Sequence, residues 1–166
     1  VGFSHTHLSG TGHSDLGDIL IMPATGQLKL NPGRAGTPDE GYRSRFSHDT
    51  EVARPGYYEV ELADYGIKAQ LTATQRVGIH KYTFPDNADG HIILDLIHGI
   101  YNYDGKTLWA NLRVENDTLL TGYRITNGWA RTNYTYFAIS LSQPIKDYGY
   151  TDKGKALYKG FWRRFN

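Results

Sequence analysis

Two consecutive stretches, Tyr57-Tyr58-Glu59-Val60-Glu61-Leu62 and Ile67-Lys68-Ala69-Gln70-Leu71-Thr72-Ala73-Thr74, carry the pattern that decides the fold. In both, apolar and polar side chains alternate with a period of two, which places them on opposite faces of a β-strand. The intervening Asp64-Tyr65-Gly66 has the composition of a tight turn. The stretch therefore predicts an antiparallel hairpin with one dry face and one wet face.

The rest of the chain continues this pattern. A third strand over 79–84 completes a meander, and no segment shows a sustained helical stripe. We expect a strand over 19–22 that Pro23 ends, a short strand over 27–30, and a strand over 91–96 that is buried on most sides. Three more are expected over 107–114, 118–126 and 134–141, followed by a tail over 152–166 without a clear period. Many strands separated by turns predict an all-β fold, a sandwich of two antiparallel sheets.

Composition sets limits on size and class. A chain of 166 residues suits one domain, predicted to span 1–166. A net charge of +1 argues against a nucleic-acid partner bound through bulk charge, and no apolar run is long enough to span a bilayer. The absence of cysteine excludes disulfides and thiol catalysis. The 13 tyrosines and 19 glycines favour aromatic strands joined by glycine turns.

The opening stretch, residues 2–12, is too polar and too rich in glycine for a core strand. His5 and His7 are two residues apart, so an extended backbone points both to one side, and Ser9 and Thr11 continue that side. Gly10 and Gly12 allow a tight turn or a close approach to a ligand. The pattern predicts either a ligand-facing loop or a polar strand that pairs with another segment.

A second irregular segment covers residues 31–50. Long segments without regular structure are usually functional or disordered, and the aromatic and basic composition of 42–48 argues against disorder. Ser47, His48 and Glu51 are reminiscent of a hydrolase triad, but triad members usually come from separate elements. We therefore predict that these three residues brace the segment against the sandwich or against a partner domain.

Four blocks of the sequence, taken in order, resemble the family 92 glycoside hydrolases. The first is Phe3-Ser4-His5-Thr6-His7-Leu8-Ser9-Gly10-Thr11-Gly12 with Asp15-x-Gly17-Asp18-Ile19-Leu20. The others run from Tyr42 to Tyr58, from Leu71 to Pro85, and through Gly128-Trp129-Ala130 with Tyr136-Phe137-Ala138. The resemblance covers residues 2 to about 144. One departure is His13, which stands where cysteine is often found in this family.

The resemblance implies a specific architecture and activity. The family comprises calcium-dependent, exo-acting α-mannosidases, among them exo-α-1,2-mannosidases, whose N-terminal domain is a β-sandwich of the galactose-mutarotase-like (supersandwich) type. The resemblance implies that this sandwich continues past Asn166, so that residues 1–166 are an incomplete domain, and that the domain packs on an (α/α)6 barrel. A carboxylic acid protonates the leaving oxygen and a carboxylate activates water, so the anomeric configuration is inverted. These groups and the ligands of the calcium cofactor belong chiefly to the barrel, which would follow the present chain in the same polypeptide.

On this resemblance, we expect the chain to form one wall of the mannose pocket without contributing the catalytic carboxylates. The substrate-binding residues predicted for this wall are His5, His7, Ser9, Gly10, Thr11, Gly12 and His13. Their imidazoles, hydroxyls and exposed backbone groups can bond sugar hydroxyls. The expected partners are a mannose-containing glycan, such as an N-glycan undergoing degradation, and the barrel domain. The expected location is the bacterial periplasm or the exterior.

Alternative interpretations remain open for most of these features. The two histidines could serve structural hydrogen bonds, and Asp15 and Asp18 are better explained as turn caps than as calcium ligands. Exposed Trp109, Trp129 or Trp162 could form the platform of a non-catalytic carbohydrate-binding module, although packing is the commoner role of tryptophan. A cupin-type metal site that combines His5 and His7 with His13 or His48 lacks the additional Glu and His expected at characteristic spacing.

Overall fold

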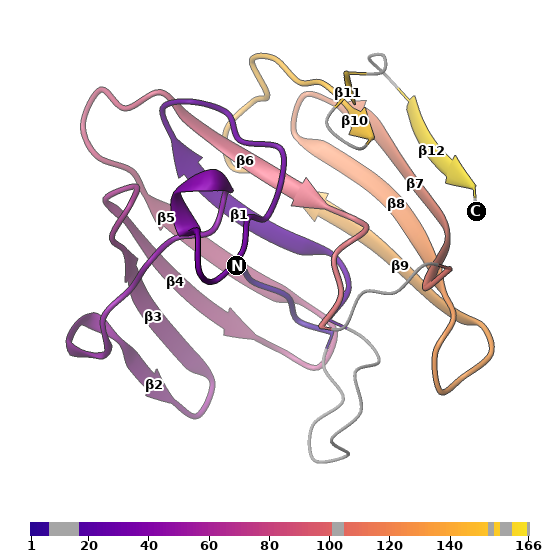
Figure 1. Ribbon diagram of the computed structural model, residues 1–166, viewed down its shortest axis with the longest axis horizontal. Coiled ribbons are helices and arrows are strands. Elements are labelled where there is room, and N and C mark those ends of the chain that lie inside the picture. Colours follow the sequence, from indigo (N-terminus) through magenta and orange to yellow (C-terminus); the bar gives the residue numbers. More distant parts are fainter. Residues whose placement is uncertain (7–16, 101–104, 153–154, 157–160, 166) are drawn as a thin grey trace. The chain divides into compact units, whose positions relative to one another are not determined.

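The computed structural model describes residues 1–6, 17–100, 105–152, 155–156 and 161–165. These residues form two compact units, one made of Val1–His5 with Leu20–Leu94 and the other of Thr6–Ile19 with Asp95–Asn166. Each unit contains a four-stranded antiparallel sheet (Figure 1). The predicted all-β, antiparallel character of the chain is confirmed.

The sheet of the first unit is a meander in the order β2-β3-β4-β5. Its strands are β2 (Val52–Arg54), β3 (Tyr57–Leu62), β4 (Ile67–Ala73) and β5 (Gly78–Thr83). The register pairs Val60 with Ala69 and Leu62 with Ile67, so the buried residues of β3 and β4 share one face. The predicted hairpin and its third strand are therefore confirmed, with boundaries that differ by one residue at most.

The opposite face of this sheet is polar. The carboxylate of Glu59 on β3 lies 2.6 Å from Lys68 Nζ and accepts a hydrogen bond of 2.9 Å from Gln70 Nε2; both partners are on β4. The hydrogen bond from Lys68 is the main reason that the pKa of Glu59 is lowered to about 2. Cross-strand pairs of opposite charge of this kind stabilise a solvent-facing sheet surface modestly.

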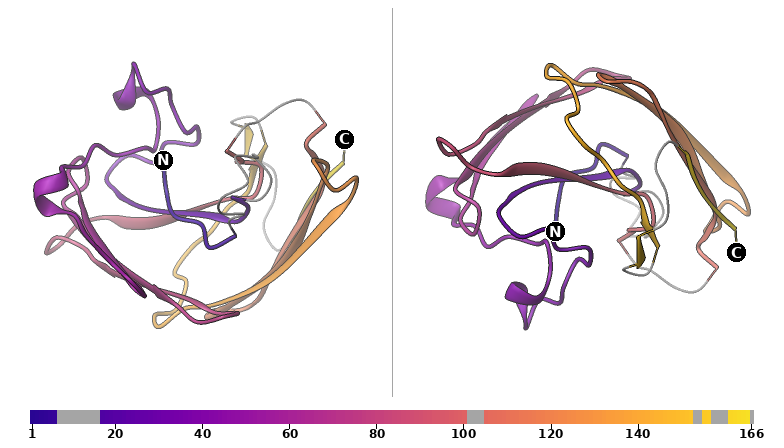
Figure 2. Two further views of the ribbon diagram at one scale, coloured as in Figure 1. Left: turned by 90° about the horizontal axis from the view of Figure 1, so that it is seen from below. Right: turned by 90° about the horizontal axis from the view of Figure 1, so that it is seen from above.

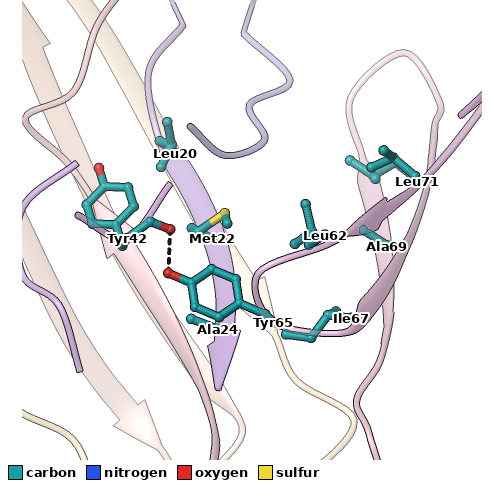
Figure 3. Packing of buried hydrophobic residues seen from close by; sticks show 10 residues of the cluster. Leu20, Met22, Ala24, Tyr42, Leu62, Tyr65, Ile67, Ala69 and Leu71 are labelled. Atoms are coloured by element: carbon teal, nitrogen blue, oxygen red, sulfur yellow. Dashed lines mark hydrogen bonds between the residues drawn. The ribbon is translucent and has the colours of Figure 1, made fainter. Parts of the chain in front are cut away.

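A two-stranded ribbon of β1 (Leu20–Thr25) and β6 (Gly90–Asp95) crosses the apolar face of the β2–β5 sheet (Figure 2). The core between them consists of Leu20, Met22, Ala24, Tyr42, Val60, Leu62, Tyr65, Ile67, Ala69 and Leu71 (Figure 3). Tyr65 donates its hydroxyl to the backbone oxygen of Tyr42 at 2.9 Å. Because a buried phenol needs a partner, this bond fixes the 31–50 segment to the core.

Three sequence predictions for this unit were wrong. Pro23 lies inside β1 and does not end it. Ile21 exchanges its backbone hydrogen bonds with Phe3, so the nitrogen of Pro23, two residues further on, faces the same side, away from β6, and no ladder bond is lost. Residues 27–30 form no strand, and Leu28 is exposed. The strand over 91–96 is less buried than predicted, since Ile92 is exposed.

The segment 31–50 is irregular, as predicted, but it is tied down at both ends. It contains two short 3-10 helices, η1 (Pro38–Glu40) and η2 (His48–Thr50). Arg43 donates to the backbone oxygens of Pro32 and Gly33 at 2.9 and 3.1 Å. Arg45 forms an ion pair with Asp64 at the turn between β3 and β4. These bonds explain how a segment with little regular structure keeps one conformation.

The sheet of the second unit has the order β12-β7-β8-β9, with the terminal strand β12 beside β7 (Figure 1). Its strands are β7 (Thr107–Asn116), β8 (Leu119–Thr126), β9 (Asn133–Ser140) and β12 (Phe161–Phe165), and a short hairpin pairs β10 (Thr151–Asp152) with β11 (Lys155–Ala156). The tail, for which no period was evident in the sequence, therefore contains three strands. No helix within the described part of the chain has the length and apolar character that crossing a membrane requires.

Candidate functional site

The predicted pocket wall is only partly visible. His5 lies among the described residues. His7, Ser9, Gly10, Thr11, Gly12 and His13 lie outside them, and so does Asp15. Their assignment as substrate-binding residues stays a prediction. The structure does define how the chain is held on each side of residues 7–16, and these two anchor points are described in turn.

The first anchor point is the contact between the His5 ring and strand β5. The Nε2 atoms of His5 and His80 are 2.5 Å apart, and the two ring centroids are separated by 4.7 Å. A Cβ atom at Gly78 would lie 2.5 Å from Nε2 of His5, which is closer than real Cβ contacts allow. The imidazole therefore lies directly against the backbone of β5, and only glycine at position 78 leaves room for it.

The ring of His80 is neutral and has a partner at each nitrogen. Burial, with a smaller contribution from His5, lowers the pKa of His80 to about 4, so this ring is neutral near pH 7. Its Nδ1 lies 2.5 Å from the Tyr82 hydroxyl, and burial raises the pKa of that phenol. Both ring nitrogens of His80 therefore have a partner, the Tyr82 hydroxyl at Nδ1 and His5 at Nε2. One ring nitrogen of His5 is already used in holding the chain.

Phe3, two residues before His5, packs against the same part of the sheet. Its ring lies 6.1 Å from His80, 6.2 Å from Tyr82 and 6.5 Å from Tyr58, measured between centroids. Its backbone exchanges hydrogen bonds of 2.9 and 2.8 Å with Ile21 on β1. Phe3 and His5 thus point to the same side of an extended backbone, as the two-residue spacing predicts, and this side faces the sheet.

The second anchor closes the base of the opening loop. The backbone N–H of Gly17 donates to the carbonyl oxygen of Thr6, and Thr6 Oγ1 donates to the carbonyl oxygen of Asp18 at 3.0 Å. Residues 6 and 17 are therefore neighbours in space. Ile19 follows with φ of 57°, which is rare for a β-branched residue and marks a sharp, strained exit from this loop.

A buried ion pair holds the exit of the loop. Asp18 Oδ1 lies 3.0 Å from Arg124 Nη1 on β8, with side-chain exposures of 1% and 0%. Arg124 also donates to the carbonyl oxygen of His98 at 2.5 Å and to Thr107 Oγ1 at 3.1 Å. Thr135 on β9 donates to the second Asp18 oxygen at 3.4 Å. Desolvation lowers the pKa of Arg124, and Asp18 opposes this effect.

Sequence reasoning missed Arg124 and assigned Asp18 to a turn cap. In β8 the residues on the same face as Arg124 are Leu120, Gly122 and Thr126, whereas the larger apolar set Leu119, Tyr123 and Ile125 lies on the other face. The alternation therefore gave no signal that the charge of Arg124 is buried. The pair joins residues 106 positions apart in sequence, so nothing local in the sequence identifies the partner. The role of Asp18 is to fix the backbone where the opening loop returns to the sheets.

Two of the three residues predicted to brace the 31–50 segment contact each other, and the third caps a short helix. Glu51 binds His48 Nδ1 at 2.5 Å and accepts the Tyr58 hydroxyl at 2.6 Å, which links the segment to β3. The hydrogen bond from Tyr58, then that from His48, lowers the pKa of Glu51, and burial raises the pKa of Tyr58 to about 12. Ser47 caps η2 by accepting from the backbone N–H of Asp49, so its hydroxyl is not arranged as a nucleophile activated by His48.

The remaining candidates from the sequence are the three tryptophans and the possible metal ligands. Trp109 lies parallel to Tyr123, whereas Trp129 is 66% exposed, and Trp162 belongs to β12. In the described part of the chain no group of three or more His, Asp or Glu side chains is placed to hold a metal ion. The described residues therefore do not assemble the cupin-type site, and the prediction that calcium is held chiefly by the barrel stays a prediction.

Comparison with known proteins identifies the family. The profile of the glycosyl hydrolase family 92 N-terminal domain matches residues 1–161. The family 92 α-mannosidase BT3965 from Bacteroides thetaiotaomicron is 42% identical over 98% of this chain, with a TM-score of 0.90 in one structure and 0.89 in its complex with mannoimidazole. The chain covers 23% and 22% of these two solved chains, which is less than a quarter of their length.

Two further relatives are more distant. The family 92 glycosyl hydrolase ccman5 is 25% identical, with a TM-score of 0.73 over 89% of this chain and 20% of its own. An uncharacterized secreted glycosidase from Arthroderma benhamiae is 33% identical over 88 residues, which is 52% of this chain and 11% of the relative. The structural match confirms the predicted fold class, the antiparallel β-sandwich of this family. With its profile matched over residues 1–161, the chain belongs to the family of glycosyl hydrolase family 92 N-terminal domains.

Proposed function

We propose that this chain is the N-terminal domain of an inverting α-mannosidase and that it forms one wall of the mannose pocket. The observation that carries the proposal is its similarity, at 42% identity over 98% of the chain, to an α-mannosidase whose structure was solved with mannoimidazole. A sandwich domain that lines a pocket supplies binding and orientation, which lower the barrier by fixing the substrate in a reactive geometry.

The wall is assigned to the opening loop. His7, Ser9 and Thr11 offer side-chain donors and acceptors, Gly10 and Gly12 offer backbone groups, and His5 and His13 flank them. The two anchor points support this assignment, because His5 is fixed on β5 and Asp18 is fixed by Arg124. A loop held at both ends places its donors more precisely than a loop free at one end, and precise placement is what recognition of sugar hydroxyls requires.

The chemistry of bond cleavage is assigned to the rest of the polypeptide. We infer that a C-terminal barrel supplies the acid that protonates the glycosidic oxygen and the base that activates water. Calcium, which would contact sugar hydroxyls as a hard cation, is assigned to ligands chiefly in that barrel, as the family resemblance implies. The present chain contributes neither step; it orients the sugar and excludes water from its side of the pocket.

Secretion is the location that fits this function, since a mannosidase of this type meets its glycans outside the cytoplasm. A secreted glycosidase among the relatives supports export. For a bacterial protein we propose the periplasm, with mannose-containing N-glycans as the material degraded. The partners are thus the α-mannoside and the barrel domain of the same polypeptide.

Kinetics of the complete enzyme test the proposal. His7→Ala should lower kcat/KM on an α-mannoside more than about tenfold, whereas a loss below about threefold, under about 0.7 kcal/mol of transition-state stabilisation, would count against a role in the pocket. Ser9→Ala should also lower it. Ser142→Ala serves as the matched control, because Ser142 is exposed and belongs to neither anchor point.

A further inference from the structure

A row of aromatic rings crosses one face of the second sheet. Trp109 on β7 lies 6.5 Å from Tyr123 on β8, at an interplanar angle of 16°. Tyr123 lies 5.4 Å from Tyr136 on β9 at 33°, and Tyr136 lies 6.5 Å from Tyr134 at 9°. The register places Tyr123 directly beside Tyr136, so the rings form one continuous row across three strands.

The row is on the solvent side of this sheet. Tyr134 is 56% exposed and Tyr136 is 71% exposed. The alternate positions Ala110 and Arg124, which point to the other face, are completely buried. Solvent-facing positions of an antiparallel sheet are normally polar, so a row of neighbouring aromatic rings at these positions indicates an interaction surface.

We propose that this aromatic row is a carbohydrate-binding surface that takes the pyranose rings of a mannose-rich glycan. A pyranose has a face of C–H groups and a rim of hydroxyls. The C–H face complements the negative face of an aromatic ring, and the phenol hydroxyls at the ring edges can bond the rim. Tyr134 and Tyr136 have nearly parallel ring planes, with centroids 6.5 Å apart, and are the two most exposed rings of the row, so they are the rings that consecutive sugar units of a chain would meet.

The surroundings of the row favour a glycan over a protein partner. Next to it on the same face lie Arg113, Glu115 and Thr121, which are joined to one another: Arg113 Nε lies 3.3 Å from Glu115, and the Thr121 hydroxyl donates to Glu115 at 2.5 Å. A row of exposed aromatic rings beside fixed polar groups suits a ligand that is apolar on one face and rich in hydroxyls at its edge. The core of a protein interface is instead depleted in charged residues.

The choice of mannose as the sugar rests on the proposed function, whereas the binding of a sugar by the aromatic row does not. The test therefore measures mannosidase activity and glycan binding by the row separately. Hydrolysis of a small α-mannoside by the complete enzyme reports on the proposed function, and retardation of the same protein in gels that contain yeast mannan reports on the aromatic row. If the enzyme cleaves the small mannoside but is not retarded by mannan, the proposal for the aromatic row is overturned and the proposed function stays intact.

The decisive variant is Tyr134→Ala with Tyr136→Ala in the complete enzyme. We expect its affinity for mannan to fall about tenfold or more, since two stacking rings are lost, with kcat/KM on the small mannoside unchanged. Tyr136→Phe keeps the ring and should keep the affinity within about threefold. Phe46→Ala, which removes an exposed ring from elsewhere, should leave mannan binding unchanged.

Two results would overturn the proposal. One is mannan binding by the double alanine variant equal to that of wild type. The other is an affinity loss of the same size for Phe46→Ala, which would mean that exposed rings bind mannan non-specifically. If the double variant does not fold, Tyr134→Ser alone replaces it and is expected to show a partial loss, whereas unchanged affinity in that variant contradicts the proposal.

Discussion

Arg124→Met removes the cation of the buried ion pair at the exit of the opening loop, and it should be strongly destabilising. The substitution leaves Asp18, whose side chain is 1% exposed, as an uncompensated buried carboxylate, and it removes the donors to His98 and Thr107. Loss of one partner of a buried pair costs about 3–5 kcal/mol. In a domain of this size, about 1 kcal/mol shifts Tm by about 2–4 °C, so we expect a decrease of about 6–20 °C.

The assay is thermal unfolding combined with hydrogen exchange of peptides from β7 and β8, which reports the local opening free energy. Arg124→Lys keeps the charge but loses the planar fork of donors, and should fall between wild type and Arg124→Met. Asp18→Leu combined with Arg124→Met removes both charges and should recover a large part of the loss. A cost below about 1 kcal/mol for Arg124→Met would refute the reasoning, because it would mean that the pair is not desolvated.

Three further predictions follow from the first unit. Gly78→Ala places a Cβ atom in the space of the His5 ring, so it should displace the opening strand and lower kcat/KM of the complete enzyme at least about threefold, whereas Gly149→Ala, which meets no neighbouring atoms, should not. Tyr65→Phe removes the donor to the Tyr42 oxygen and should cost about 1–2 kcal/mol in chemical denaturation, and an equal cost for the exposed Tyr134→Phe would contradict this. His80 binds its proton less readily when folded, with a pKa of about 4 against 6.5, so stability should fall as pH decreases from about 6.5 to 4; His80→Phe should remove that part of the pH dependence of Tm.

The sequence predicted the positions of the strands better than it predicted the contacts between residues of different strands. Alternation identified β3, β4 and β5 because one face of that sheet packs on a core and the other meets water, and side-chain polarity records this difference directly. Pro23 was misread because a missing N–H weakens a strand only on the side where a ladder bond exists. Residues 27–30 were misread because a short apolar alternation also occurs in an exposed connection.

The site was predictable only in its local part. The spacing of His5 and His7 predicted an extended backbone with both side chains on one side; His7 lies outside the described residues, so this stays a prediction, while Phe3 and His5 do lie on one side of the backbone. The partners that hold it, His80 on β5 and Arg124 on β8, come from strands far along the chain. Such contacts depend on strand order and register, which a single sequence does not encode in any local pattern.

The central claim is that this chain forms one wall of a mannose pocket, and a crystal structure of the complete polypeptide with mannoimidazole tests it most directly. The account predicts that the ligand accepts or donates hydrogen bonds, at distances up to about 3.5 Å, with groups of the opening loop between His5 and His13. A ligand bound entirely by the rest of the polypeptide, with no atom of residues 1–166 within that distance, would contradict it.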